Sequence, residues 1–312
     1  MIRNGAMRQP RLPAARAALT LFRRQPLPWV FLFIDLYWTL GVQGLITFPY
    51  GVDGAVYSGA ARAWLTGMDP WRVTVEGLRF AGPPPTLILY VPFAFLPTAA
   101  SVALLLVADL VAIRFALRRL RLAWWWILFP PILQGLMSVN PDPIVVACLV
   151  ARHPALQALG PVVKVYGLFP LAGERRVAAF VGAGLALAIS AWLLPWGLFV
   201  QDLPVIASTL ETQGANVSAY SVPLLLPIGL LALWRFGSRR AGWLAVPVIW
   251  PHTQLHYATI SLPAMTPLIA VGFSLPIPGA PAVAVAAQAL LERHRPRGRW
   301  ADLELPPPAS PA

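Results

Sequence analysis

The sequence is poor in charge, in acidic residues and in cysteine. Only 12% of its 312 residues are Asp, Glu, Lys or Arg, whereas soluble domains carry about a quarter. Its one cysteine, Cys148, lies in an apolar run, so no intramolecular disulfide can form. The sequence also lacks a P-loop, a G-x-G-x-x-G fingerprint, a nucleophile elbow and any Cys/His cluster. Nothing in it therefore supports chemistry that depends on ATP or NAD.

What the sequence does contain is apolar blocks separated by arginines and by Pro/Gly breaks, with a mean hydropathy of +0.66. The first block, Pro28 to Phe48, has about the 20 residues that cross a bilayer. The pattern is typical of an all-α polytopic membrane protein with about nine or ten transmembrane helices. The predicted spans are 28–48, 84–97, 98–116, 122–138, 141–151, 155–172, 176–197, 221–236, 241–251 and 256–273, with a weaker apolar segment at 277–291.

The net charge is +12, and Lys164 is the only lysine. Because the arginines flank apolar blocks, they favour topology signals and contacts with anionic lipid headgroups over nucleic-acid binding. Residues 1–24 hold six arginines and no acid, which predicts a cytoplasmic N-terminus and a first loop on the outer face of the cell membrane. Loop 198–220 and the WPHTQLHY segment also fall outside. The arginines between 114 and 121 fall on the outer face if 84–97 and 98–116 are separate spans, which conflicts with the positive-inside rule. A re-entrant hairpin within 84–151 would remove the conflict, and both arrangements stay open.

The sequence divides into three parts. We expect a basic cytoplasmic N-terminus at 1–27, a single transmembrane domain at 28–292 with its first outer loop at 49–83, and a basic, proline-rich tail at 293–312.

The first outer loop places two of the chain's 12 acidic residues around a short helix. Between residues 55 and 66, Tyr57 and Trp64 share one face, which predicts an amphipathic helix on the membrane surface with both rings at headgroup depth. Asp53 precedes this helix and fits two roles, an N-cap or a carboxylate base that removes a proton from an attacking hydroxyl. Asp69, before Pro70, fits an ordinary turn.

Several stretches of the sequence resemble glycosyltransferase family 87, whose members are polyprenyl-phosphate-sugar-dependent membrane enzymes of the GT-C fold. The first loop carries the most specific part of the resemblance, while Gly82 or Pro83 stands where the family has an aromatic residue. Asn140 matches a G-[QN]-x-N segment, and Lys164 matches a lysine-bearing helix. The resembling stretches are VDGAVYSGAARAWLTGMDPW, FAGPPPTLILYVPFAFLP, GLMSVNPDPIVVACLV, LGPVVKVYGLFPLAGERR, QGANVSAYS and WPHTQLHYATISLPAM.

The resemblance implies a GT-C-like helical bundle that transfers a sugar, most plausibly mannose, from a polyprenyl-phosphate donor to a glycan or glycolipid hydroxyl, with inversion. Asp53 would be the general base, acting on the outer face. Lys164 would offset charge on the departing phosphate. Asp69 would bind acceptor, or a divalent cation (Mg²⁺ or Mn²⁺) if one is used. The candidate substrate-binding residues are Asp69, Tyr57, Arg62, Lys164, His252, His256 and Asn140.

Each of these roles competes with a simpler one. A lysine in the middle of an apolar helix either faces a cavity or snorkels to the membrane surface. His252 and His256 share a face if their segment is helical, but the glutamate of a zinc-protease motif is missing. Sugar or phosphate contacts, or interfacial anchoring alongside Tyr257, are therefore favoured over zinc. Asp35 and Asp109 lie inside predicted spans, where Asp109 could pair with Arg114. A transporter or flippase of lipid-linked saccharides, and an inactive scaffold, remain alternative functions.

Overall fold

The computed structural model describes residues 25–38, 49–212 and 216–293, and these are mostly helical. The predicted N-terminal segment and C-terminal tail lie almost wholly outside them. The elements, with η for a 3-10 helix, are α2 Leu27–Leu36, α3 Val52–Leu65, η2 Pro70–Arg72, β1 Thr74–Val75, β2 Leu78–Arg79, α4 Pro84–Ala94, α5 Thr98–Arg119, η3 Trp124–Leu128, α6 Pro130–Ser138, α7 Asp142–Val150, α8 Pro154–Val163, η4 Val165–Gly167, α9 Leu168–Gly173, α10 Val177–Leu193, α11 Trp196–Thr212, η5 Ala219–Ser221, η6 Pro223–Leu225, α12 Leu226–Phe236, α13 Ser238–Ile249, η7 Leu255–Ala264, α14 Pro267–Phe273 and α15 Ala280–Leu291.

Proline explains why most of these helices are short. It stands at the first position of α4, α6, α8 and α14, where its missing N–H costs no intrahelical hydrogen bond. The predicted span 155–172 is three helices, α8, η4 and α9, and the predicted span 256–273 is η7 followed by α14, which Pro267 begins. The first part of the expected outer loop 198–220 is helical and belongs to α11, and its place outside the membrane stays a prediction.

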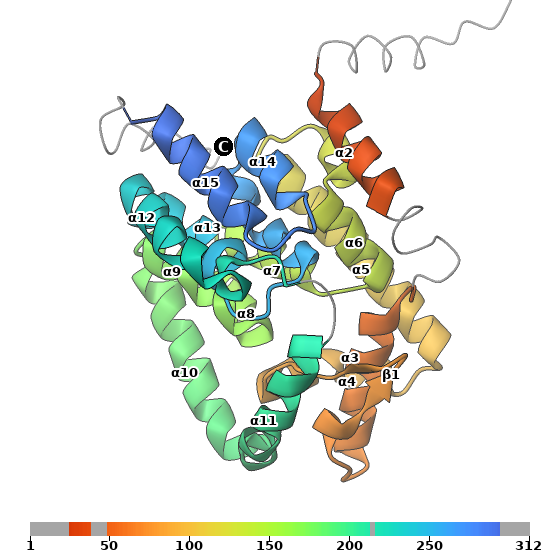
Figure 1. Ribbon diagram of the computed structural model, residues 1–312. Coiled ribbons are helices and arrows are strands. Elements are labelled where there is room, and N and C mark those ends of the chain that lie inside the picture. Colours follow the sequence, from red (N-terminus) through yellow and green to blue (C-terminus); the bar gives the residue numbers. More distant parts are fainter. Residues whose placement is uncertain (1–24, 39–48, 213–215, 294–312) are drawn as a thin grey trace, which may run out of the picture.

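Among the described residues, α5 alone is long and apolar enough to cross a membrane as one straight helix. The pair formed by α10 and the first part of α11 meets the same criterion together, but it bends by 103° at the break. Figure 1 shows α10 running along one side of the molecule. It leads to α11, which lies at the same end of the molecule as α3 and α4. The nine or ten predicted spans stay a prediction.

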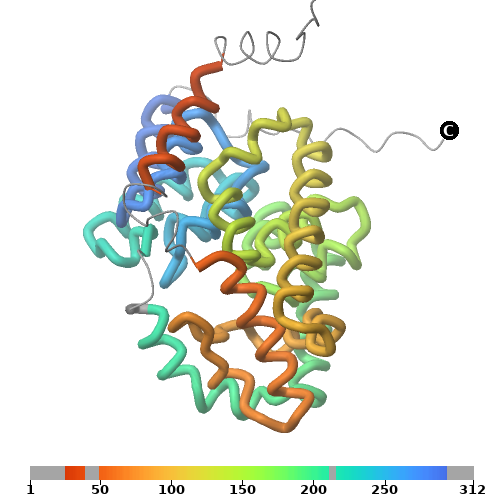
Figure 2. Tube along the Cα trace, turned by 90° about the vertical axis from the view of Figure 1, so that its right-hand side faces the viewer, coloured from red at the N-terminus to blue at the C-terminus, as the bar shows by residue number. Residues whose placement is uncertain are grey.

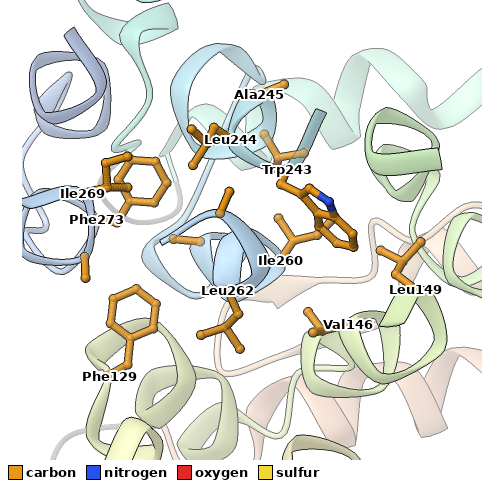
Figure 3. Packing of buried hydrophobic residues seen from close by; sticks show 14 of the residues in the cluster. Phe129, Val146, Leu149, Trp243, Leu244, Ala245, Ile260, Leu262, Ile269 and Phe273 are labelled. Atoms are coloured by element: carbon orange, nitrogen blue, oxygen red, sulfur yellow. The ribbon is translucent and has the colours of Figure 1, made fainter. Parts of the chain in front are cut away.

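Two apolar cores hold the helices together. The larger one surrounds η7, where Ile260 and Leu262 pack against Trp243 of α13, Val146 of α7 and Phe129 (Figure 3). The smaller one joins α3, α4 and the two-stranded hairpin β1–β2. In Figure 2 this smaller group lies at one end of the long helix α5, so the first loop is a folded part of the protein.

The expected surface position of the helix after Asp53 is wrong. Helix α3 is largely buried, and only 8% of Tyr57 is exposed. The Tyr57 ring packs against Tyr90 and Phe80, with centroids 4.8 and 5.3 Å away. Helix α3 is narrow because it contains small residues, including Ala60 and Ala61. Neighbouring elements can therefore pack closely on both of its sides, and no polar face is left in water.

Glycine allows a close helix contact between α9 and α13. A Cβ on Gly173 would lie 2.4 Å from the Ser238 carbonyl oxygen and 3.0 Å from the Gly242 Cα. Both are backbone atoms, which cannot move aside as a side chain would. We expect Gly173→Ala to lower the free energy of unfolding by about 1–3 kcal/mol, measured by denaturant unfolding in detergent.

Gly184→Ala is the matched control, because Gly184 lies inside α10 with nothing within 4 Å of its would-be Cβ. It should leave stability unchanged or raise it by up to about 1 kcal/mol. Equal effects of the two substitutions would contradict the tight contact between α9 and α13.

Candidate functional site

The start of α3 is fixed by a glycine that no other residue could replace without strain. Gly51 has φ 70°, and a Cβ there would lie 2.5 Å from Val102 of α5. Its N–H donates a hydrogen bond to the Met137 carbonyl at 2.8 Å. Because α3 is held against both α5 and α6, Asp53 in its first turn has a defined position. This carboxylate is only partly buried.

Asp53 does not cap its helix, so that interpretation is wrong. The N-cap is Gly51, and no side chain there accepts a hydrogen bond from the helix end. The left-handed glycine starts the helix two residues before Asp53, which places the carboxylate inside the first turn. Its contact is instead with a residue 87 positions later in the chain, Asn140.

Asn140 reaches Asp53 through an unusual turn at the end of α6. Val139 adopts a left-handed conformation with φ 59°, which is rare for a β-branched residue. Gly54 makes room for it, since a Cβ on Gly54 would lie 3.0 Å from the Val139 side chain. Asn140 Nδ2 then donates a hydrogen bond to Asp53 Oδ2 at 3.0 Å. The predicted binding residue Asn140 is thus in direct contact with the predicted base.

The Asn140 amide has only one satisfactory orientation. Its Oδ1 accepts hydrogen bonds from Lys164 Nζ at 3.1 Å and from the Asp142 N–H at 3.2 Å. Turning the amide over would point its NH₂ group at these two donors and its oxygen at the Asp53 carboxylate. The buried donors therefore fix the amide so that it donates to Asp53.

Lys164 is buried, with 7% of its surface exposed, but it does not lie in the middle of a helix as predicted. The helix ends before it, because Lys164 is the C-cap of α8 and has an extended backbone with φ −139°. Its ammonium group lies 3.4 Å from Asp142 Oδ1 and 4.7 Å from the centre of the Tyr257 ring. A charge buried away from water needs such partners, and the snorkelling alternative is wrong.

Asp142, Tyr166 and Tyr257 complete the cluster, although sequence reasoning included none of them among the candidate site residues. The Tyr166 hydroxyl donates to Asp142 Oδ1, and the Tyr166 and Tyr257 rings pack with centroids 5.1 Å apart. The available signal was an aspartate two residues after Asn140 and a tyrosine two residues after the only lysine. Which of these residues meet depends on the turn between α7 and α8, which residue spacing does not reveal.

His256 joins the cluster from η7, but only loosely. Its Nε2 lies 3.8 Å from Asp142 Oδ2, beyond hydrogen-bond distance. Both atoms are buried, and neither has a hydrogen-bond partner among the described residues. Such unsatisfied buried atoms are uncommon in folded proteins. A further polar group placed between His256 Nε2 and Asp142 Oδ2 would supply the hydrogen-bond partner that each atom lacks.

His252 does not share a helical face with His256, contrary to the prediction. His252 has a left-handed backbone with φ 55°, and η7 begins only at Leu255. The His252 ring faces Tyr220, with centroids 6.2 Å apart. The two histidines are separated by a turn, so their i, i+4 spacing carries no helical meaning.

Arg62 and Asp69 also have structural roles away from Asp53. Arg62 donates to the carbonyls of Ala94 and Leu96 at the end of α4, at 2.9 and 2.7 Å. Asp69 lies beyond the far end of α3, separated from Asp53 by about 18 Å of helix at 1.5 Å per residue. It accepts the Trp71 N–H at 2.9 Å, as predicted for a turn residue.

Asp69 does not fit the divalent cation that the resemblance left open. Its carboxylate is engaged by the Trp71 N–H and by Arg72 Nε at 3.3 Å, and a guanidinium beside it disfavours a second cation. Within the described segments, no group of three or more His, Cys, Asp or Glu side chains is placed to hold a metal ion.

Asp109 lies on the inward face of α5 and is 1% exposed. The expected ion pair with Arg114 is wrong, because Arg114 is exposed on the outward face of the same helix. Asp109 Oδ1 has no hydrogen-bond partner among the described residues.

The site is therefore a chain of contacts that runs from the partly buried Asp53 through Asn140 to the buried Lys164 and Asp142. Comparisons of this chain with protein-family models, with curated proteins and with solved structures found no match.

Proposed function

We propose that the protein is an integral-membrane glycosyltransferase of the GT-C type that transfers a sugar from a polyprenyl-phosphate donor to a hydroxyl group on the outer face of the cell membrane. The observation that carries the proposal is the orientation of Asp53. A carboxylate that is still partly accessible is held by Asn140, whose amide is in turn fixed by a buried lysine and aspartate. Such rigid support is what a catalytic group requires.

In the proposed reaction Asp53 acts as general base. Asn140 occupies Oδ2, which leaves Oδ1 to accept the proton of the acceptor hydroxyl. The freed oxygen attacks the anomeric carbon from the side opposite the phosphate. The bond between that carbon and the phosphate oxygen breaks, and the bonding electrons leave with polyprenyl phosphate. One displacement inverts the anomeric configuration, with the base opposite the departing group.

Lys164 has a different task from the one the resemblance implied. It is already paired with Asp142, so much of its charge is neutralised before any substrate arrives. Its role in this proposal is to hold the Asn140 amide in the orientation that donates a hydrogen bond to Asp53.

The membrane placement is supported by the apolar helices. The outward face of α5 exposes Leu104, Val107, Val111 and Phe115 to a substantial degree, and α10 does the same with Leu185, Ile189 and Trp192. Large exposed apolar surfaces of this kind mark sites that contact a membrane or another protein. A lipid-linked donor suits such a site, because its prenyl tail stays in the bilayer while the sugar phosphate reaches Asp53.

The deciding experiment supplies donor to membranes that contain the protein. Radiolabelled polyprenyl-phosphate mannose, and a panel of other polyprenyl-phosphate sugars, are incubated with glycan and glycolipid acceptors, using membranes without the protein as control. We expect labelled acceptor only when the protein is present, with an inverted linkage. Absence of product with every donor would overturn the proposal.

A transporter of lipid-linked saccharides is the second candidate, and it is favoured by Asp109, which is buried in α5 with one carboxylate oxygen lacking a hydrogen-bond partner among the described residues. Ionisable groups inside membrane helices often line a substrate path. Movement of intact donor across the membrane, without transfer to any acceptor, would select this alternative in the same assay.

A further inference from the structure

Arginines from three separate connections meet at the far end of α7 from the proposed site. Arg119, the last residue of α5, donates from Nε to the Val150 carbonyl at 3.3 Å. Arg176, just before α10, donates from Nη1 to the Leu149 carbonyl. These are the last carbonyls of α7, which lack partners within the helix. Arg152 follows two residues after Val150, and Arg121 two residues after Arg119. We call Arg119, Arg121, Arg152 and Arg176 the arginine cluster.

The arginine cluster also bears on the topology conflict in the sequence. Arg119 belongs to the arginines between 114 and 121 that disagreed with the predicted topology, and Arg176 follows 57 residues later. Their hydrogen bonds to neighbouring carbonyls of α7 put both at one end of the molecule. This is the arrangement that the positive-inside rule requires of arginines on a cytoplasmic face.

The arginine cluster has more positive charge than its surroundings neutralise. Arg119 interacts electrostatically with each of the other three members. Within the described residues, Glu174 is the acid that forms an ion pair with a member, Arg176, so four positive charges face one negative charge and +3 remains. Arg152 is exposed and is not used to hold a helix carbonyl. Guanidinium groups gathered in this way are suited to a phosphate, which accepts their paired N–H donors.

Two apolar helix faces lead away from the arginine cluster. Helix α5 ends at Arg119, and α10 begins immediately after Arg176. The exposed apolar residues in the adjoining turns of these helices include Val111 and Phe115 on α5, with Val177, Phe180 and Val181 on α10. A ligand with an anionic head and two long apolar chains therefore matches the charge of the cluster and the surface on either side of it.

We propose that the arginine cluster binds the headgroup of an anionic phospholipid, whose acyl chains lie along the exposed faces of α5 and α10. The inference rests on the membrane placement proposed above but not on sugar transfer. The site is distinct from the Asp53 cluster, since Asp142 and Val150 stand at opposite ends of α7, about 12 Å apart at 1.5 Å per residue.

The test uses the full-length protein purified in a neutral detergent. Phosphatidylglycerol, phosphatidylcholine or inorganic phosphate is titrated in, and the midpoint of thermal unfolding is followed. The variant is Arg152→Gln, because this side chain is exposed and supports no helix end. The control is Arg72→Gln, which removes the same charge from a side chain that is 76% exposed in the first loop.

We expect phosphatidylglycerol to raise the unfolding midpoint of the wild type and of Arg72→Gln at the same lipid concentration. Arg152→Gln should need about five times more lipid for half of the effect, the loss expected for one arginine at an anionic surface. Phosphatidylcholine and inorganic phosphate should have little effect. Equal titrations of the two variants would overturn the proposal, as would stabilisation by phosphatidylcholine alone or an equal shift with free phosphate. Because no sugar is present, failure here is distinguishable from failure of the glycosyltransferase.

Discussion

Asp53→Asn is expected to reduce sugar transfer by about 10²–10⁴-fold, the usual contribution of a general base. The substitution removes the proton acceptor and keeps the size and hydrogen-bonding shape of the side chain. The amide oxygen of the new asparagine can still accept the hydrogen bond from Asn140 Nδ2, so we expect the fold to remain. The measurement is the initial rate of labelled product in membranes with equal amounts of each protein.

Asp69→Asn is the matched control for this result. Both substitutions change one first-loop carboxylate to an amide, but Asp69 caps η2 and lies beyond the far end of α3. Its variant should keep a transfer rate within a few-fold of wild type, with any loss arising from stability. If Asp53→Asn transfers sugar as fast as Asp69→Asn, then Asp53 is not the base, whatever the protein does.

Lys164→Met is expected to lower the free energy of unfolding by about 3–5 kcal/mol, which is the cost of breaking a buried ion pair by removing one partner. Methionine preserves much of the volume but leaves the Asp142 carboxylate, which is 2% exposed, without its cation. It also removes the donor that fixes Asn140 Oδ1. The measurement is denaturant unfolding in detergent, compared with the wild type.

The double variant Lys164→Met/Asp142→Asn separates charge from packing. Without the carboxylate, no uncompensated charge remains, so we expect the double variant to regain most of the stability that Lys164→Met loses. Transfer should stay low in both variants because the Asn140 amide is no longer fixed. Stability losses that add together in the double variant would contradict a direct pair between the two residues.

Sequence reasoning found the residues whose chemistry is unusual for their surroundings. A lone lysine in an apolar stretch had to find a polar environment, and Lys164 does so beside Asn140. Asp53 followed from the position of a carboxylate at the start of a helix. In both cases the chemistry of the residue pointed to a special location. Asp53 keeps its proposed role as base, whereas the role of Lys164 differs from the one expected.

The wrong predictions have a common physical cause. Helices in this protein begin and end at positions where the hydropathy of the sequence does not change. Gly51 starts α3 in a left-handed conformation, so Asp53 is not the cap. His252 is also left-handed, so the two histidines do not align. Asp142 and Tyr166 meet because the α7–α8 hairpin returns the chain to Asn140. No local pattern of residues encodes that return.

The unequal helix lengths have a consequence for the membrane around the protein. At 1.5 Å per residue, α5 with 22 residues reaches about 33 Å, while α10 with 17 residues reaches about 25 Å. A hydrocarbon layer about 30 Å thick matches the first helix but exceeds the second. In the proposed placement, either the bilayer becomes thinner beside α10 or the side chains that flank this helix reach toward the membrane surface. Hydrophobic mismatch would therefore make the protein prefer shorter acyl chains on its α10 side, so lipid thickness as well as headgroup charge would act on it.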